Sequence, residues 1–197
     1  MSFRILLLFA MVLGQSLVVG AQVQCPGGVE FEENIVVEDF NKNDVELTLN
    51  GVANKKVFIF NVMYAALYLE TPSQDGDAII ASDQAKVGII HALRDVTAEQ
   101  LSGLWEDEFI RLCEDQCEEL RPVHDEFLSY MRDVNKHERV HLVVLPEGLH
   151  VEYGPNEVYP FIPSPDYANL IQRSLLGPSP ADQAIKEGLL GQSQICN

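Results

Sequence analysis

Residues 49–70 (LNGVANKKVFIFNVMYAALYLE) constrain the fold more than any other stretch of the chain. Two lysines lead into a run of mostly apolar residues, and both alternating sets of side chains in that run are apolar. An extended strand with two apolar faces has to be covered on both sides. The β-branched and aromatic content of residues 57–62 favours a strand, although YAALYLE would also suit a buried helix. We therefore predict the central strand of a sheet that is packed between other layers.

The composition is that of one globular domain with an acidic surface. Of the 197 residues, 47% are hydrophobic, and the formal net charge is −17. A chain of this length and composition can bury a core of its own. Its charge repels nucleic acid and anionic membranes unless a local basic patch intervenes, and the sequence shows no such patch. We expect no nucleic-acid partner.

The N-terminus has the three parts of a secretory signal peptide. A short positive start with Arg4 precedes an apolar core at residues 5–19, and Val-Gly-Ala at residues 19–21 suits cleavage. The apolar core is shorter than the roughly 20 residues that a membrane-spanning helix needs. An uncleaved membrane anchor is the alternative to a signal peptide. Residues 22–24 lack the small side chains that precede a lipid-anchored cysteine. We predict a signal peptide at residues 1–21, a domain at residues 22–197, and a secreted or periplasmic protein without membrane insertion after cleavage.

Four cysteines allow three disulfide pairings in an oxidising compartment. Cys25 and Cys196 lie near the two ends of the predicted domain, whereas Cys113 and Cys117 are one helical turn apart. In a regular helix the Cα–Cβ bonds of residues four apart run parallel, so a bridge between Cys113 and Cys117 is disfavoured unless the helix is distorted. All three pairings remain open.

Two groups of side chains invite a metal-site interpretation. The Cys113–Cys117 pair with His124 lacks the fourth ligand of a structural zinc site. His137 and His141 would be roughly 13 Å apart along a strand, which is too far for one ion. The acidic residues on the helix predicted to begin at Thr97 are typical of a solvated face. We expect no metal.

The remaining segments predict strands and helices in alternating blocks. Residues 97–100 (TAEQ) form a capping box, in which the side chains of the first and last residue each bind the other's backbone N–H. The helix behind it has an apolar stripe, and a second helix is expected from Pro122 to about residue 134. Ser-Pro pairs at 164–165 and 179–180 predict two further helix starts, the first helix ending at Gly177. Strands are expected at residues 35–40, 45–49, 86–92, 139–145 and 149–153. This order predicts an α+β fold, an antiparallel sheet with helices mainly on one face.

Three segments together resemble the chalcone isomerase-like family: the central stretch, ALRDVTAEQL at residues 92–101, and LLGPSPADQAIKEGLLG at residues 175–191. The resemblance spans roughly residues 29–191. It implies an open-faced β-sandwich, a large antiparallel sheet covered by a layer of α-helices, with a ligand cleft between them. The family contains cofactor-free isomerases that close a chalcone to a flavanone, and relatives that bind fatty acids.

The resemblance also assigns the family's functional positions to residues of this chain. The family's arginine falls on Lys55, its strand hydroxyl donor on Met63, its helix tyrosine on Leu101 and its asparagine on Glu108. Ser174 alone matches the hydroxyl residue of the plant enzymes. An isomerase needs hydrogen-bond donors where charge develops on the ketone. We therefore expect an exported member that lacks most of the catalytic set.

We predict a non-catalytic binder of a small hydrophobic or amphipathic molecule, for example one like a fatty acid, without a cofactor. The anionic end of the ligand would lie near Lys55 or Lys56, and its body would contact apolar side chains. The candidate ligand-binding residues are Lys55, Met63, Tyr64, Leu101, Trp105, Glu108 and Ser174.

Two other functions remain open. One is a cofactor-free isomerase or intramolecular lyase on another substrate, which would require the hydroxyl of Tyr64 or Ser174 to face Lys55. The other is a structural or interaction protein without a ligand site. In that case Lys55 and Lys56 would be a solvated strand edge, and the aromatic candidates would be core residues.

Overall fold

The computed structural model describes residues 21–154 and 156–197, and it contains two antiparallel sheets. The larger sheet has six strands in the order β3-β4-β5-β6-β7-β8, so strands that follow one another in the chain are also neighbours in space. These strands are β3 (Asn34–Glu38), β4 (Asp44–Val57), β5 (Phe60–Leu69), β6 (Lys86–Ala92), β7 (Arg139–Leu145) and β8 (Gly148–Tyr153). The smaller sheet pairs β1 (Gln22–Cys25) with β2 (Val29–Glu32).

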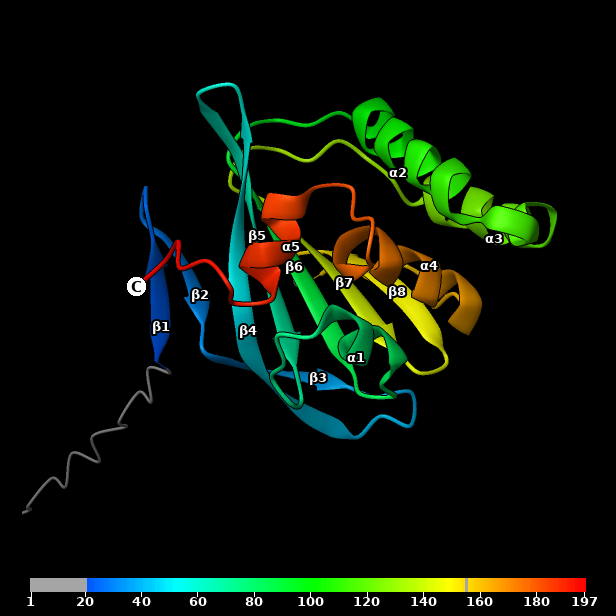
Figure 1. Cartoon of the computed structure of the whole chain (residues 1–197), viewed down its shortest axis with the longest axis horizontal. Coiled ribbons are helices and arrows are strands. Elements are labelled where there is room, and N and C mark those ends of the chain that lie inside the picture. Colours follow the sequence, from blue (N-terminus) through cyan, green and yellow to red (C-terminus); the bar gives the residue numbers. More distant parts are fainter. Residues whose placement is uncertain (1–20, 155) are drawn as a thin grey trace, which may run out of the picture.

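The helices pack on one face of the large sheet, and β1 and β2 lie on the other side (Figure 1). They are α1 (Gly76–Ala81), α2 (Ala98–Leu112), α3 (Cys117–Ser129), α4 (Pro165–Leu176) and α5 (Gln183–Leu189), with a single 3-10 turn, η1 (Glu114–Gln116), between α2 and α3. This architecture confirms the predicted α+β class with a helical layer on a large antiparallel sheet. Within the described residues, no helix has the length and apolar character needed to cross a membrane. The predicted signal peptide, apart from Ala21, lies outside the described residues.

The central stretch forms a hairpin, and the prediction of one continuous strand was wrong. β4 ends at Val57, β5 begins at Phe60, and the two strands pair antiparallel through a turn at Phe58 and Ile59. Such turns usually use Asn-Gly or Asp-Gly. Because the turn residues here are as apolar as the strands, hydrophobic periodicity alone could not locate the turn. Burial on both faces is nevertheless found in β5, where residues 64–69 are all buried.

The two faces of β5 pack against different layers. Leu67 and Leu69 pack on the helix side against residues of α1, α4 and α5. Tyr64 and Tyr68 point to the opposite side, where they pack in a cluster that includes Phe31 of β2. The Tyr64 hydroxyl donates to the backbone oxygen of Pro26 at 3.0 Å, and the Tyr68 hydroxyl donates to that of Glu32 at 2.8 Å. The sheet is therefore covered on both faces at its centre.

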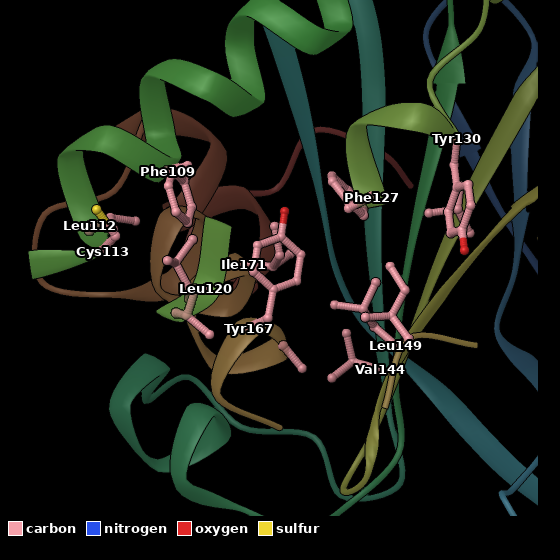
Figure 2. Close-up of a cluster of buried hydrophobic side chains, with 14 of the residues drawn as sticks. Phe109, Leu112, Cys113, Leu120, Phe127, Tyr130, Val144, Leu149, Tyr167 and Ile171 are labelled. Atoms are coloured by element: carbon pink, nitrogen blue, oxygen red, sulfur yellow. The ribbon is translucent and has the colours of Figure 1, made fainter. Parts of the chain in front are cut away.

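The helical layer is anchored by aromatic side chains from three helices. Phe109 of α2, Phe127 of α3 and Tyr167 of α4 meet in one buried cluster, which also includes Val144 and Leu149 of the sheet (Figure 2). The predicted capping box of α2 is present, since the Thr97 side chain accepts from the Gln100 backbone and the Gln100 side chain accepts from the Thr97 backbone. This cluster packs α2, α3 and α4 against the sheet.

Two helix starts differ from the predicted ones. α3 begins at Cys117, so Pro122 lies inside the helix instead of opening it. α5 is capped by Asp182 and not by Ser179, because the Asp182 carboxylate accepts from the backbone of Ala184 and Ile185. Both residue types favour the N-cap position, and Asp182 also pairs with a residue of the sheet, as described below. The predicted start of α4, with Ser164 as N-cap, and its end at Gly177 are confirmed.

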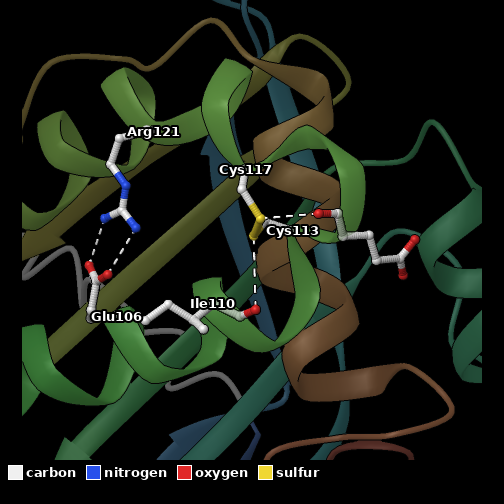
Figure 3. The surroundings of a disulfide bond; sticks show 6 residues. Glu106, Ile110, Cys113, Cys117 and Arg121 are labelled. Carbon is white, nitrogen blue, oxygen red and sulfur yellow. Dashed lines mark hydrogen bonds and ion pairs between the residues drawn. A yellow bond between two sulfur atoms is a disulfide. The ribbon is translucent and has the colours of Figure 1, made fainter.

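The structure contains two disulfide bonds, Cys25–Cys196 and Cys113–Cys117. The sequence left the pairing open and disfavoured a Cys113–Cys117 bond unless the helix is distorted, and the structure shows that distortion. α2 ends at Leu112, Glu114 adopts a φ of 51°, and α3 starts only at Cys117. The two cysteines therefore flank a corner between helices and do not lie on one regular helix (Figure 3).

Candidate ligand cavity

A cavity of about 370 Å³ lies between the large sheet and the helices. This volume falls in the range of small-molecule sites, roughly 300–1,000 Å³. Its wall is almost entirely apolar. The sheet side consists mainly of residues from β5 to β8, including Met63, Ala65, Leu67, Gly88, Ile90, Ala92, Val140, Leu142, Val151 and Tyr153. The helix side includes Leu101, Leu104, Trp105, Phe127, Met131, Ile171, Leu175, Ile185 and Leu189.

Small residues at the centre of the sheet create this space. Ala65 and Gly88 lie on neighbouring strands, and both line the cavity. A Cβ atom added at Gly88 would meet no other atom within 4 Å. The aromatic cluster of α2 to α4 keeps the helices from closing on these small residues, because packed cores yield little to local strain.

One end of the cavity reaches the molecular surface. Val57 of β4 and Leu104 of α2 line it, and they are 38% and 53% exposed. The Leu93 backbone N–H donates to the oxygen of Val62 at 2.9 Å, which places the segment after β6 beside the start of β5. The β4–β5 hairpin, the segment after β6 and the first turns of α2 thus form the mouth.

Lys55 lies at this mouth and is paired with an acid. It lines the cavity, and its ammonium group forms an ion pair with the Asp182 carboxylate at the start of α5. Burial alone would raise the pKa of Asp182, but hydrogen bonds from Lys55 and from the Ile185 backbone outweigh it and lower the pKa. Asp182 is therefore charged at neutral pH, and the Lys55–Asp182 pair contributes no net charge to the mouth.

Arg94 is a second cation at the mouth, and it was not among the predicted site residues. It is an exposed residue between β6 and α2 that lines the cavity. No acidic group in the described part of the chain lies within ion-pair distance of its guanidinium. The residue stands in the ALRDVTAEQL segment that supported the family resemblance. Only its position after β6, at the edge of the predicted cleft, could have indicated a role.

Lys86 lies at the other end of the cavity. It is 5% exposed, and its ammonium donates to the backbone oxygens of Ser82 at 2.7 Å and Gln84 at 3.0 Å. Burial lowers the pKa of Lys86, although the charges of Asp83 and Glu70 act in the opposite direction. Its hydrogen bonds hold the ammonium on backbone carbonyls, so the inner end offers mainly the aliphatic part of this side chain.

The structure brings four of the seven candidate site residues to the cavity. Met63 lines the sheet side next to Lys55, its partner in the β4–β5 register. Leu101 and Trp105 line it from α2, and the Trp105 ring packs edge-on against Phe127, with 5.5 Å between ring centroids. Lys56, the alternative cation, is exposed on the adjacent strand position.

The other three candidates lie outside the cavity. Tyr64 alternates with Met63 along β5 and therefore points to the opposite face of the sheet. Glu108 pairs with Arg111 one turn along α2. Ser174 is 1% exposed, and its hydroxyl donates to the backbone oxygen of Ile171 at 2.9 Å within α4. These side chains serve packing and local hydrogen bonding.

This arrangement leaves few proton donors for isomerase chemistry. Neither the Tyr64 nor the Ser174 hydroxyl faces Lys55, because each is bonded to a backbone oxygen elsewhere. Among the described lining residues only Tyr153 carries a hydroxyl, and burial raises the pKa of that phenol. Within residues 21–154 and 156–197, no group of three or more histidine, cysteine or acidic residues is arranged to hold a metal ion.

The fold is similar to that of a solved fatty-acid-binding protein from Arabidopsis thaliana. The two share 15% sequence identity with a TM-score of 0.65, and the match covers 87% of this chain and 97% of the plant protein. Among curated proteins, no sequence matches this chain. The sequence model of the chalcone isomerase-like family matches residues 24–191, nearly the whole described chain. The chain therefore belongs to the chalcone isomerase-like family.

Proposed function

We propose that this protein binds a single-chain amphipathic acid, such as a fatty acid, in the cavity and does not convert it chemically. The observation that carries the proposal is an apolar cavity with an unpaired arginine, Arg94, at its mouth in the described structure. The plant protein of similar fold is described as fatty-acid binding, which supports this ligand class.

The proposed pose follows from the charges of the cavity. The alkyl chain lies between the small residues of the sheet and Trp105, because burial of apolar surface stabilises it by roughly 25 cal/mol per Å². The carboxylate stays at the mouth, where Arg94 can form two parallel hydrogen bonds with it. Lys55 is next to this position but already neutralised by Asp182, so it adds less.

A catalytic role as an isomerase is not favoured. Chalcone cyclisation needs several donors that converge on one ketone oxygen, and the hydroxyls of Tyr64 and Ser174 are bonded elsewhere. We also propose that the protein acts after export, with residues 1–21 removed. The two disulfide bonds support this location, because such bonds persist mainly in oxidising compartments.

The proposal can be tested with the intrinsic fluorescence of Trp105, the single tryptophan of the chain. Titration of the mature protein with saturated and unsaturated C10 to C18 acids should change its emission and saturate at one ligand per protein. Calorimetry should give the same stoichiometry. If no acid in this series changes the emission or produces heat, the proposal fails.

A pair of glycine variants locates the site. Gly88→Leu places a side chain in the open space of the cavity, whereas Gly103→Leu places the same side chain in equally open space on the exposed surface of α2. Gly88→Leu should lower the affinity at least tenfold, and Gly103→Leu should leave it unchanged. Equal affinities would show that the ligand binds elsewhere.

A comparison of two ligands tests the contact between the ligand carboxylate and Arg94. The methyl ester of the best acid should bind about tenfold more weakly than the acid, which corresponds to about 1.4 kcal/mol. In Arg94→Gln this preference for the acid should largely disappear. A preference that survives in the variant would assign the carboxylate to another cation.

A further inference from the structure

The tip of the β4–β5 hairpin exposes three consecutive large apolar side chains. Phe58 is 94% exposed, Ile59 85% and Phe60 65%. In Figure 1 this hairpin extends beyond the rest of the sheet at the top of the view. Single exposed apolar residues are common, but a contiguous exposed group marks an interaction site or a membrane contact.

The fold itself does not require apolar side chains at the tip of the hairpin. Phe58 has a φ of 55°, a conformation that glycine or asparagine adopts more easily than a bulky side chain. A phenylalanine there costs free energy, and a side chain that is 94% exposed offsets little of it by packing. A glycine at position 58 would make the same hairpin more favourably. The apolar tip is therefore better explained by a contact outside the chain.

The tip is continuous with the mouth of the cavity. Val57 precedes the tip, Val62 follows it, and both line the cavity. Leu104 of α2, also exposed, completes the apolar surface on the other side of the mouth. An apolar molecule that leaves the cavity would pass directly along the exposed hairpin.

The charges around the tip differ from those of the rest of the chain. The formal net charge of −17 led to the expectation that the chain repels anionic membranes, yet residues 55–62 contain two lysines and no acid, which makes the tip a local exception. Lys56 is exposed, with no acidic partner in the described part of the chain, and Arg94 lies across the mouth. Asp182 is paired with Lys55, and Asp95, next to Arg94 in the chain, accepts from the Lys136 backbone at 2.7 Å.

We propose that the hairpin tip docks on a phospholipid surface and holds the mouth of the cavity against it. Phe58, Ile59 and Phe60 enter the boundary between headgroups and acyl chains, and Lys56 meets the phosphates. Such contacts reach roughly 5–10 Å into the interface. The exchange of a fatty acid between cavity and bilayer rests on the proposed function, whereas the docking itself does not.

A bilayer suits this surface better than a second copy of the chain. A stable protein interface buries roughly 800 Å² on each partner with close shape complementarity. A two-residue turn with its flanking positions offers a narrow, convex surface. A fluid interface accepts protruding apolar side chains without a matching groove.

The test measures co-sedimentation of ligand-free mature protein with vesicles of phosphatidylcholine, and of phosphatidylcholine with one quarter phosphatidylglycerol. The wild type should bind both. The triple variant F58S/I59S/F60S should bind at least tenfold more weakly. The matched control V36S/I110S/V158S also removes three exposed apolar side chains, 61%, 63% and 61% exposed, but none of them lines the cavity. It should bind like the wild type.

Three results would overturn the proposal: no binding of the wild type to either vesicle, equal loss in the control variant, or unchanged binding in the tip variant. Sedimentation of the protein alone provides a further check. Self-association of the wild type that the tip variant abolishes would assign the tip to a homodimer and also overturn it.

A separate measurement keeps the two proposals apart. Fatty-acid affinity is measured in vesicle-free buffer, where the tip variant should match the wild type because Phe58, Ile59 and Phe60 do not line the cavity. Vesicle binding without fatty-acid binding would refute only the proposed function. Fatty-acid binding without vesicle binding would refute only the docking. If both hold, transfer of a fluorescent fatty acid to vesicles should accelerate with vesicle concentration in the wild type and not in the tip variant.

Discussion

The two disulfide bonds should contribute very differently to stability. A disulfide stabilises a fold mainly by reducing the entropy of the unfolded chain, and the effect grows with the logarithm of the closed loop. The Cys25–Cys196 bond joins residues 171 apart, and Cys113–Cys117 joins residues four apart. These separations correspond to about 5 kcal/mol for the first bond and about 2 kcal/mol for the second.

The assay compares C25S/C196S with C113S/C117S in urea, with circular dichroism as the readout. The first variant should lose about 3 kcal/mol more unfolding free energy than the second. In thermal unfolding its midpoint temperature should lie roughly 6–12 °C below that of the second variant. Its native structure should persist, because Gln24 and Asn197 exchange two backbone hydrogen bonds, 2.7 and 2.9 Å long, beside the bond.

Because the two double variants are matched, comparing them tests whether the stabilisation grows with the length of the closed loop. Both variants remove two half-buried or buried sulfurs and introduce two serines, so side-chain effects largely cancel. An equal loss in the two variants, or a larger loss in C113S/C117S, would mean that local packing at the α2–α3 corner outweighs the constraint on the chain ends.

Two further predictions concern charge. Asp182→Asn keeps a helix-capping side chain but removes the charge that neutralises Lys55. The affinity for a fatty-acid anion, measured by calorimetry, should therefore rise about fivefold, equivalent to about 1 kcal/mol. An unchanged affinity would place the ligand carboxylate away from Lys55. Hydrogen bonds from His141 and His150 lower the pKa of Glu152 from 4.5 to about 2, against the effect of burial. The stabilisation is therefore present above pH 4.5 and lost as the pH falls toward 2, on the order of 3 kcal/mol. Glu152→Gln should flatten the unfolding free energy over that window in acid titrations, and a slope as steep as that of the wild type would contradict this assignment.

Local sequence signals located most helices and strands. The capping box at residues 97–100 and the Ser-Pro pair at 164–165 each open a helix in the structure. The strand expected at residues 86–92 is found with the same bounds. These signals succeed because they describe interactions between residues close together in the chain, which hold wherever the segment is placed.

The features that the sequence mispredicted or left open share a different cause. The turn at Phe58 and Ile59 contains no turn residue, so no local pattern separates it from the flanking strands. The bond between Cys113 and Cys117 depends on a corner at Glu114. The sequence does not predict the φ of 51° that Glu114 adopts there. The cap of α5 is Asp182 and not the predicted Ser179, and both residue types favour that position. In each case the local pattern did not distinguish between the possible conformations.

The sequence by itself determined the class of the fold, its family, the two-sided burial of residues 64–69 and the apolar character of any cleft. Only the tertiary structure decided which side chains share that cleft. Met63 and Tyr64 are neighbours in the chain, yet the pleat of β5 sends one into the cavity and the other to the opposite face. Arg94 joins the mouth because the segment after β6 lies beside β5. Composition and periodicity report the environment a residue needs, whereas a site depends on which distant residues the strand register and helix packing bring together.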